Sequence, residues 1–141
     1  MRGDEEEYRR LIENLIRFAG LEPRECYIAE QDCWQFSKGS VDIYVYMVAI
    51  GGEHYINVAS PLMAAPPLRR EELYERLLRE NAQRIAVKFS LRDDVVWLEI
   101  NRELAGLGFD ELKRTLVRVA EVADELYAPL TAEFGEPAED A

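Results

Sequence analysis

The chain has 141 residues, of which 48% are hydrophobic and 32% are charged, a composition typical of a folded globular protein. A chain of this length buries a core without metal ions or disulfide bonds. The net charge of −11 repels phosphate backbones and anionic lipid headgroups. We therefore expect neither a nucleic acid nor a membrane as partner.

The first residues, MRGDEEEYRR, are acidic where a secretory signal would be basic and then apolar. No apolar run approaches the ~20 residues needed to cross a bilayer. These features predict a cytoplasmic protein. We expect one domain over residues 1–141, with a core at about 5–134 and an acidic tail at 135–141.

The spacing of apolar residues predicts the elements in chain order. Helical spacing predicts a first helix over about 4–19, which stops at Gly20. A period of two between Ile28 and Ser60 predicts three strands, and Pro61, Pro66 and Pro67 are expected to end strand pairing. A second helix is predicted over 68–81, two strands over 85–101 and a final helix over 109–134, which Pro129 should kink or end.

The predicted order is therefore αβββαββα. Short connections between most strands favour a mainly antiparallel sheet of about five strands, with three helices packed on it. This is an α+β fold.

Two-residue turns are predicted at Lys38-Gly39, Gly51-Gly52 and Asp93-Asp94, and each turn fixes a strand register. The predicted pairs are Phe36 with Val41, Trp34 with Ile43, Met47 with Ile56, Val45 with Val58, Leu91 with Val96, Phe89 with Leu98, and Val87 with Ile100. In every hairpin the large apolar side chains fall on one face, which we assign to the core.

The opposite face of the predicted sheet is unusually apolar. Lys88 lies opposite Glu99 there, which predicts a cross-strand ion pair at a solvated end. The remaining large side chains are Tyr44, Tyr46, Val48, Ile50, Tyr55 and Trp97. Such a patch is typical of an interface or binding groove, so these six are the candidate partner-binding residues. The alternatives are that the middle helix or a loop covers the patch, or that Trp97 packs on a helix of its own chain.

The sequence contains few candidates for chemistry. His54 is the only histidine, and the spacing of Cys26 and Cys33 matches neither a redox motif nor a zinc knuckle, so free thiols are expected. Asp93-Asp94 lacks the further ligands of a calcium loop, and no phosphate-binding glycine motif is present. We predict no catalytic residues, no metal site and no cofactor.

Four stretches carry a family resemblance: CWQFSKGSVDIYVYM, YINVASPLM, LYERLLRENAQRIAVKFSLRDDVVWLEINREL and FDELKRTLVRVAEVADELYAPL. In this order, over about residues 5–134, they resemble the YbjN-domain family. The resemblance implies the fold of the type III secretion chaperones, often as a homodimer, and a role as a regulator in bacterial sensory transduction. It supplies no catalytic residues to carry over.

We therefore predict a non-enzymatic binding or regulatory protein that acts as a homodimer or through a protein or peptide partner. It is expected to use the outer sheet face, and also the middle helix, to bind a second copy of itself or another protein. One alternative is a chaperone that holds an extended segment of a client protein. Another, of a different class, is a small-molecule sensor or enzyme with a cleft of carboxylates and tyrosines.

Overall fold

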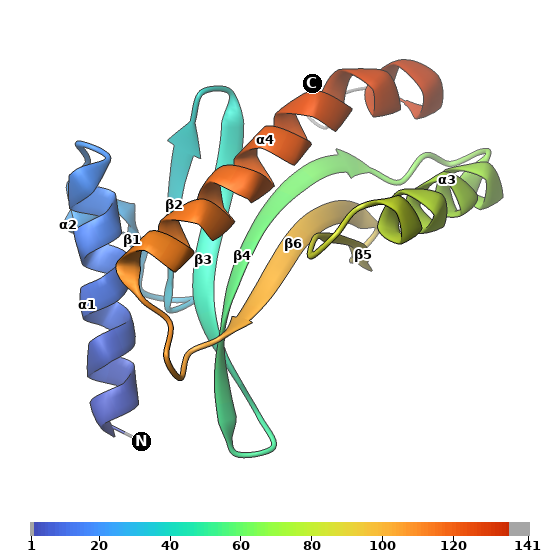
Figure 1. Ribbon diagram of the computed structural model, residues 1–141. Coiled ribbons are helices and arrows are strands. Elements are labelled where there is room, and N and C mark those ends of the chain that lie inside the picture. The colour runs from blue at the N-terminus through green and yellow to red at the C-terminus, as the bar shows by residue number, and fades with distance from the viewer. Residues whose placement is uncertain (1, 136–141) are drawn as a thin grey trace.

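The computed structural model describes residues 2–135, with side chains described from residue 5 onward. Its elements, shown in Figure 1, are α1 (Arg2–Phe18), α2 (Pro23–Cys26), β1 (Tyr27–Ile28), β2 (Cys33–Lys38), β3 (Val41–Ile50), β4 (Glu53–Ala64), α3 (Arg70–Gln83), β5 (Lys88–Arg92), β6 (Val95–Glu103) and α4 (Phe109–Phe134). The predicted acidic tail lies, beyond Gly135, outside the described residues. None of the described helices is long and apolar enough to cross a membrane.

The strands form one antiparallel sheet in the order β1-β2-β3-β4-β6-β5, which confirms the α+β class. The described chain has six strands and four helices rather than the five and three predicted. The additional elements are β1, with two residues, and α2, with four. Segments this short contain only about one hydrophobic repeat, so periodicity does not reveal them.

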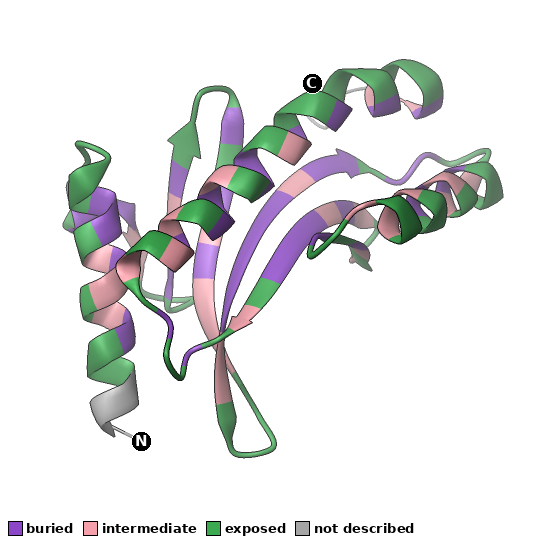
Figure 2. Ribbon diagram, viewed as in Figure 1, coloured by how far each residue is buried: buried purple, intermediate pink, exposed green. Residues whose placement is uncertain are grey.

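The helices lie on one side of the sheet. In Figure 1, α4 crosses in front of the middle strands, with α1 beside its N-terminal end and α3 beside the β6–β5 edge. Figure 2 shows that buried residues line the sheet-facing side of α4 and much of β4 and β6. Pro129 does not end α4, because the helix continues to Phe134, although its last turns leave the line of the earlier ones in Figure 1.

The observed register agrees with two of the three predicted hairpins. Val45 pairs with Val58 and Phe89 with Leu98, as expected from the turns at Gly51-Gly52 and Asp93-Asp94. The first hairpin was predicted wrongly, because its turn is Gly39-Ser40. Its pairs are therefore Trp34 with Val45, Phe36 with Ile43 and Lys38 with Val41. Gly39 has a φ of 65°, which suits a two-residue turn with glycine in its first position.

β4 continues past Pro61 to Ala64, so the expectation that this proline ends pairing was wrong. Pro61 still pairs with Trp97 of β6, and the register shifts between Pro61 and Met63. The pairing with β3 ends at Ala59, so from there onward β4 has a neighbour on one side only. A proline, which lacks a backbone N–H, is tolerated where one side of a strand is unpaired.

The core lies between the sheet and the helices. Trp34 is buried as predicted and packs edge to face against Tyr8 of α1, with ring centroids 5.6 Å apart. Both cysteines are buried free thiols. Two residues assigned to the core are less buried than expected: Met47 is half-buried and Leu91 is 46% exposed. Leu91 belongs to β5, an edge strand with a neighbour on one side only.

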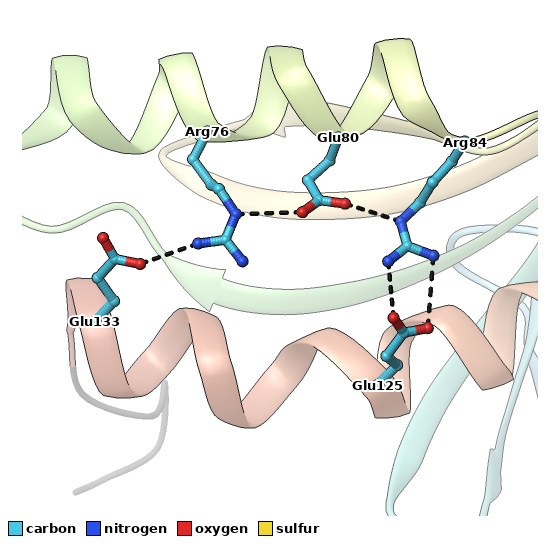
Figure 3. A network of polar contacts seen from close by, with 5 residues as sticks. All are labelled: Arg76, Glu80, Arg84, Glu125 and Glu133. Atoms are coloured by element: carbon cyan, nitrogen blue, oxygen red, sulfur yellow. Dashed lines mark hydrogen bonds and ion pairs between the residues drawn. The ribbon is translucent and has the colours of Figure 1, made fainter.

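A chain of ion pairs joins α3 to α4 (Figure 3). The carboxylate of Glu80 accepts hydrogen bonds from Nε of Arg76 at 3.2 Å and from Nε of Arg84 at 2.9 Å. Arg76 also contacts Glu133, and Arg84 contacts Glu125, each at 2.9 Å. Burial alone would raise the pKa of Glu80, but the hydrogen bonds from Arg84 and Arg76 outweigh it and lower the pKa. These contacts hold α3 on the helix side of the sheet.

Candidate partner-binding face

We call the side of the sheet opposite the helices the outer face. The six predicted partner-binding residues all lie on it: Tyr44, Tyr46, Val48 and Ile50 on β3, Tyr55 on β4 and Trp97 on β6. Ile50 is 64% exposed and the other five are half-buried. Because α1, α3 and α4 pack on the core side, the described part of the chain places no helix over this face. The sheet therefore brings the predicted residues together and leaves them accessible.

Aromatic rings occupy one end of the outer face. Tyr44 and Trp97 meet edge to face, with ring centroids 5.5 Å apart. The guanidinium of Arg92 lies 4.6 Å from the Trp97 ring and 5.9 Å from the Tyr46 ring, within the range of a cation–π contact. Arg92 thus joins the two tyrosines and the tryptophan into one cluster, and Trp97 packs against side chains of the sheet.

A buried polar cluster lies beside these rings. Glu99 is 6% exposed. Its carboxylate accepts hydrogen bonds from Asn57 and Arg92, both at 2.6 Å, and from Ser90 at 2.5 Å. Burial alone would raise the pKa of Glu99, but the hydrogen bonds from Ser90 and Asn57 and the charges of Arg92 and Lys88 outweigh it and lower the pKa. The carboxylate is therefore ionised at neutral pH.

This cluster corrects the predicted ion pair between Lys88 and Glu99. The two residues are opposite each other, as expected, but Glu99 forms its salt bridge with Arg92 and is buried rather than solvated. Arg92 reaches Glu99 from the end of β5, a diagonal contact that a direct cross-strand pairing rule does not predict. The sequence did contain a sign of this polar cluster. Glu99 and Asn101 are alternate polar residues of one strand, and Asn101 lies opposite the polar Asn57.

The outer face is hollowed beside the polar cluster. A depression of about 410 Å³ is lined on one side by Tyr46, Val48, Ile50 and Tyr55, and on the other by Asn57, Ser90, Arg92, Glu99 and Asn101. A second depression of about 400 Å³ is lined by Gln31, Cys33, Tyr44, Tyr46, Arg92 and Trp97. The two share Tyr46 and Arg92 and are therefore neighbours. Together they offer apolar walls beside hydrogen-bonding groups, the combination that a bound chain segment requires.

The pKa values of Tyr44, Tyr46 and Glu99 on the outer face are displaced away from neutral pH. Burial raises the pKa of the Tyr44 and Tyr46 hydroxyls, so both remain protonated. The carboxyl of Glu99 shifts in the opposite direction and stays ionised. General acid–base catalysis works best with a pKa near the operating pH, so these groups suit binding better than proton transfer. Within residues 5–135, no three His, Cys, Asp or Glu side chains are grouped to hold a metal ion.

A second apolar surface lies between α3, the predicted middle helix, and the edge strand β5. A groove of about 240 Å³ is lined by Tyr74, Leu77, Leu78, Asn81, Phe89, Ser90 and Leu91. Leu78 is 67% exposed, and Ile85, in the connection from α3 to β5, is 84% exposed. The side-chain oxygen of Asn81 accepts a hydrogen bond from the backbone N–H of Phe89 at 2.8 Å, which fixes the groove's two sides relative to each other.

The sequence matches the YbjN family, described as "Putative bacterial sensory transduction regulator", over residues 9–132. The chain belongs to the YbjN family. This match covers most of the chain and confirms the resemblance of the four stretches. No curated protein matches this YbjN-family chain.

Solved structures with a similar fold are chains of protein complexes, among them one from a type III secretion system. The YbjN-family chain is similar to a chain of the ExsC–ExsE complex, with 14% identity, a TM-score of 0.69, and coverage of 89% of this chain and 94% of that chain. It is also similar to a chain of the HopA1–SchA chaperone–effector complex, with 10% identity, a TM-score of 0.65, and coverage of 86% and 93%. A third is a chain of the heterodimeric ExoU–SpcU complex of Pseudomonas aeruginosa, with 17% identity, a TM-score of 0.63, and coverage of 84% and 96%. The protein therefore shares the fold of these chains.

Proposed function

We propose that this YbjN-family protein is a non-enzymatic regulator that holds a segment of a partner protein on its outer face. One observation carries the proposal: a sheet face with six large apolar or aromatic residues and a buried polar cluster has no helix over it in the described chain. An exposed apolar patch of this kind, rimmed by polar groups, is typical of a protein interaction site. The proposal also includes one domain over 5–134, since the core cluster extends from Tyr8 to Phe134.

The shape of the outer face favours a segment as the bound part of the partner. The two depressions adjoin across Tyr46 and Arg92, and each has an apolar and a polar wall. A partner segment buries side chains against the rings and directs hydrogen-bonding groups toward Asn57 and Asn101. The chaperone–effector complex among the similar structures supports this chaperone-like form of binding. The displaced pKa values of Tyr46 and Glu99 argue against the enzyme alternative.

We also propose that the protein forms a homodimer through the groove between α3 and β5, which leaves the outer face open for the partner. The exposed side chains of Leu78, Ile85 and Leu91 gather along this edge. A two-fold axis brings the same surface of both copies together, so each copy buries its own apolar residues against those of the other. Helix α3 also carries acidic and basic residues beside Leu78, such as Glu75 and Arg79, which allow complementary contacts between copies.

Site-specific photo-crosslinking in cells of the source organism tests the outer-face proposal. A photoreactive phenylalanine analogue replaces Tyr55 on the outer face or, as the matched control, Tyr127 on α4. Both positions carry a tyrosine with accessible surface, but they lie on opposite sides of the sheet. We expect a covalent adduct with a defined protein at position 55 only, and its loss when Tyr46→Glu is added.

The Tyr46→Glu variant places a carboxylate beside Glu99, so its folding is checked by circular dichroism. Ile50→Glu, at an exposed position of the outer face, serves as the second variant. The same adduct from positions 55 and 127, or an adduct that survives both glutamate substitutions, would show that the partner binds elsewhere.

A further inference from the structure

Asn57 has a hydrogen-bonding capacity that the described chain does not use. Its side chain is 2% exposed, and its amide nitrogen donates to Glu99 at 2.6 Å and to Asn101 at 2.8 Å. Its side-chain oxygen Oδ1 is buried and has no partner among the described residues. A buried acceptor without a donor is unfavourable, and buried polar groups in folded proteins are nearly always paired. Asn57 is among the residues that line the larger depression of the outer face, so a ligand bound there is the candidate source of a donor.

The charges around this depression favour a cation. Glu53 and Glu103 lie on the outer face at the end near the Gly51-Gly52 turn, where Glu103 is directly opposite Tyr55. Tyr55 lines the depression and its hydroxyl donates to Glu53 at 3.1 Å, so the two glutamates lie next to the depression without lining it. The other end holds Arg92, whose guanidinium is already bound to Glu99. An anion would find no uncommitted arginine there and would meet the repulsion of Glu53 and Glu103.

The apolar wall of the depression suits a long side chain. Val48 and Ile50 of β3, with the ring of Tyr55, form a surface against which methylene groups can pack. Arginine and lysine cover apolar surface with their stems and keep the charged group near polar atoms. A guanidinium has five N–H donors in a fixed plane and can therefore bond to more than one acceptor at once.

We propose that the depression between Tyr46 and Asn101 is a subsite for one basic side chain, preferably arginine, of the partner segment. The stem packs on Val48 and Ile50, a donor satisfies the orphan oxygen of Asn57, and Glu53 and Glu103 attract the charge. This inference rests on the proposed function, because it names the chemistry recognised on the same face. The overall charge of −11 supports it by drawing basic segments toward the protein.

Peptide binding measured by isothermal titration calorimetry tests the subsite. The probes are heptapeptides of alternating leucine and serine with arginine, lysine, norleucine or glutamate at the central position. We expect the arginine peptide to bind about tenfold more tightly than the norleucine peptide, as a charge-assisted hydrogen bond would provide. The lysine peptide should have the next highest affinity and the glutamate peptide the lowest. The advantage of arginine should decrease as the salt concentration rises.

Three variants decide which residues cause the preference for arginine. We call the ratio of the affinities of the arginine and norleucine peptides the arginine advantage. The double variant Glu53→Gln/Glu103→Gln changes exposed residues only, and should reduce the arginine advantage to about threefold or less. Asp42→Asn removes a charge from the far end of the same face and should leave the advantage intact. Asn57→Leu should abolish the contribution of the orphan oxygen, and its folding is checked separately because Asn57 also supports Glu99.

The outcomes separate the subsite from the proposed function. Equal binding of the arginine and norleucine peptides, with both lost in Tyr46→Glu, would overturn the subsite and leave the outer face as a binding surface. An arginine advantage that survives the Glu53→Gln/Glu103→Gln double variant would also overturn it. If no peptide binds the wild type, the subsite is wrong, and the crosslinking experiment decides the proposed function independently.

Discussion

The rings of Tyr44 and Trp97 meet edge to face across β4, with their centroids 5.5 Å apart. Tyr44 is paired with Ala59, and Trp97 is paired with Pro61 two residues farther along the same strand. Ala59 is fully buried, so a small side chain lies beneath two large ones. The aromatic end of the outer face therefore depends on the small volume of a residue in the central strand.

Enlarging Ala59 should separate the two rings. We expect Ala59→Leu to lower the free energy of unfolding by about 1 to 3 kcal/mol, because overpacking forces neighbouring side chains out of their preferred rotamers. Urea denaturation followed by tryptophan fluorescence measures the change. Ala49→Leu, at an exposed position of β3, is the control and should change stability by less than about 0.5 kcal/mol. Equal stability of both variants would show that the Tyr44–Trp97 contact does not require a small residue at 59.

Glu99→Gln should make stability less dependent on pH. At pH 7 we expect the substitution to lower the free energy of unfolding by about 1 to 3 kcal/mol, because Arg92 keeps its position but loses an ionised partner. The folded pKa of Glu99 lies below its unfolded value of about 4.3, so the ionised form contributes stability above that pH. This contribution disappears as pH falls through the folded pKa.

Urea denaturation of wild type and Glu99→Gln between pH 7 and pH 3 measures this linkage. The difference in free energy of unfolding between wild type and Glu99→Gln should be constant near neutral pH. It should narrow below about pH 4.3. Glu103→Gln, at an exposed position of the same strand, should show little difference at any pH. A gap between wild type and Glu99→Gln that stays constant down to pH 3 would contradict the lowered pKa.

Glu80 should contribute more to the stability of the fold than Glu75, another glutamate of the same helix. It binds two arginines, which in turn bind Glu125 and Glu133 of α4, whereas Glu75 forms an exposed pair with Arg79 within α3. We expect Glu80→Gln to cost about 1 to 2 kcal/mol and Glu75→Gln less than about 0.5 kcal/mol. Thermal denaturation at low and high salt measures both. If Glu80→Gln and Glu75→Gln both lowered stability by similarly small amounts, the α3–α4 contact would be held by apolar packing alone.

The proposed dimer edge and the proposed partner face should respond to different substitutions. Leu78→Glu places a charge in the groove between α3 and β5 and should convert a dimer of the wild type to a monomer in sedimentation velocity. Leu68→Glu, at an exposed position before α3, and Tyr46→Glu on the outer face should leave the mass unchanged. A wild type that stays monomeric at every concentration, or a dimer lost only in Tyr46→Glu, would overturn the assignment of the dimer edge.

The first hairpin shows why face assignments are easier to predict than registers. The expected pair of Trp34 with Ile43 is in fact Trp34 with Val45, a change of two residues. Because side chains alternate with a period of two, such a change keeps every residue on its face. All six predicted partner-binding residues were therefore placed on the correct face despite the wrong turn.

The sequence by itself determined the class of fold, the two faces of the sheet and the apolar character of the outer face, because hydrophobic periodicity and turn residues act over a few neighbouring positions. Only the tertiary structure placed β6, rather than β5, beside β4. This choice brings Asn57 next to Asn101 and Glu99, buries a carboxylate that the sequence assigned to solvent, and leaves the oxygen of Asn57 without a partner. Strand order depends on contacts between distant segments, which no local pattern encodes.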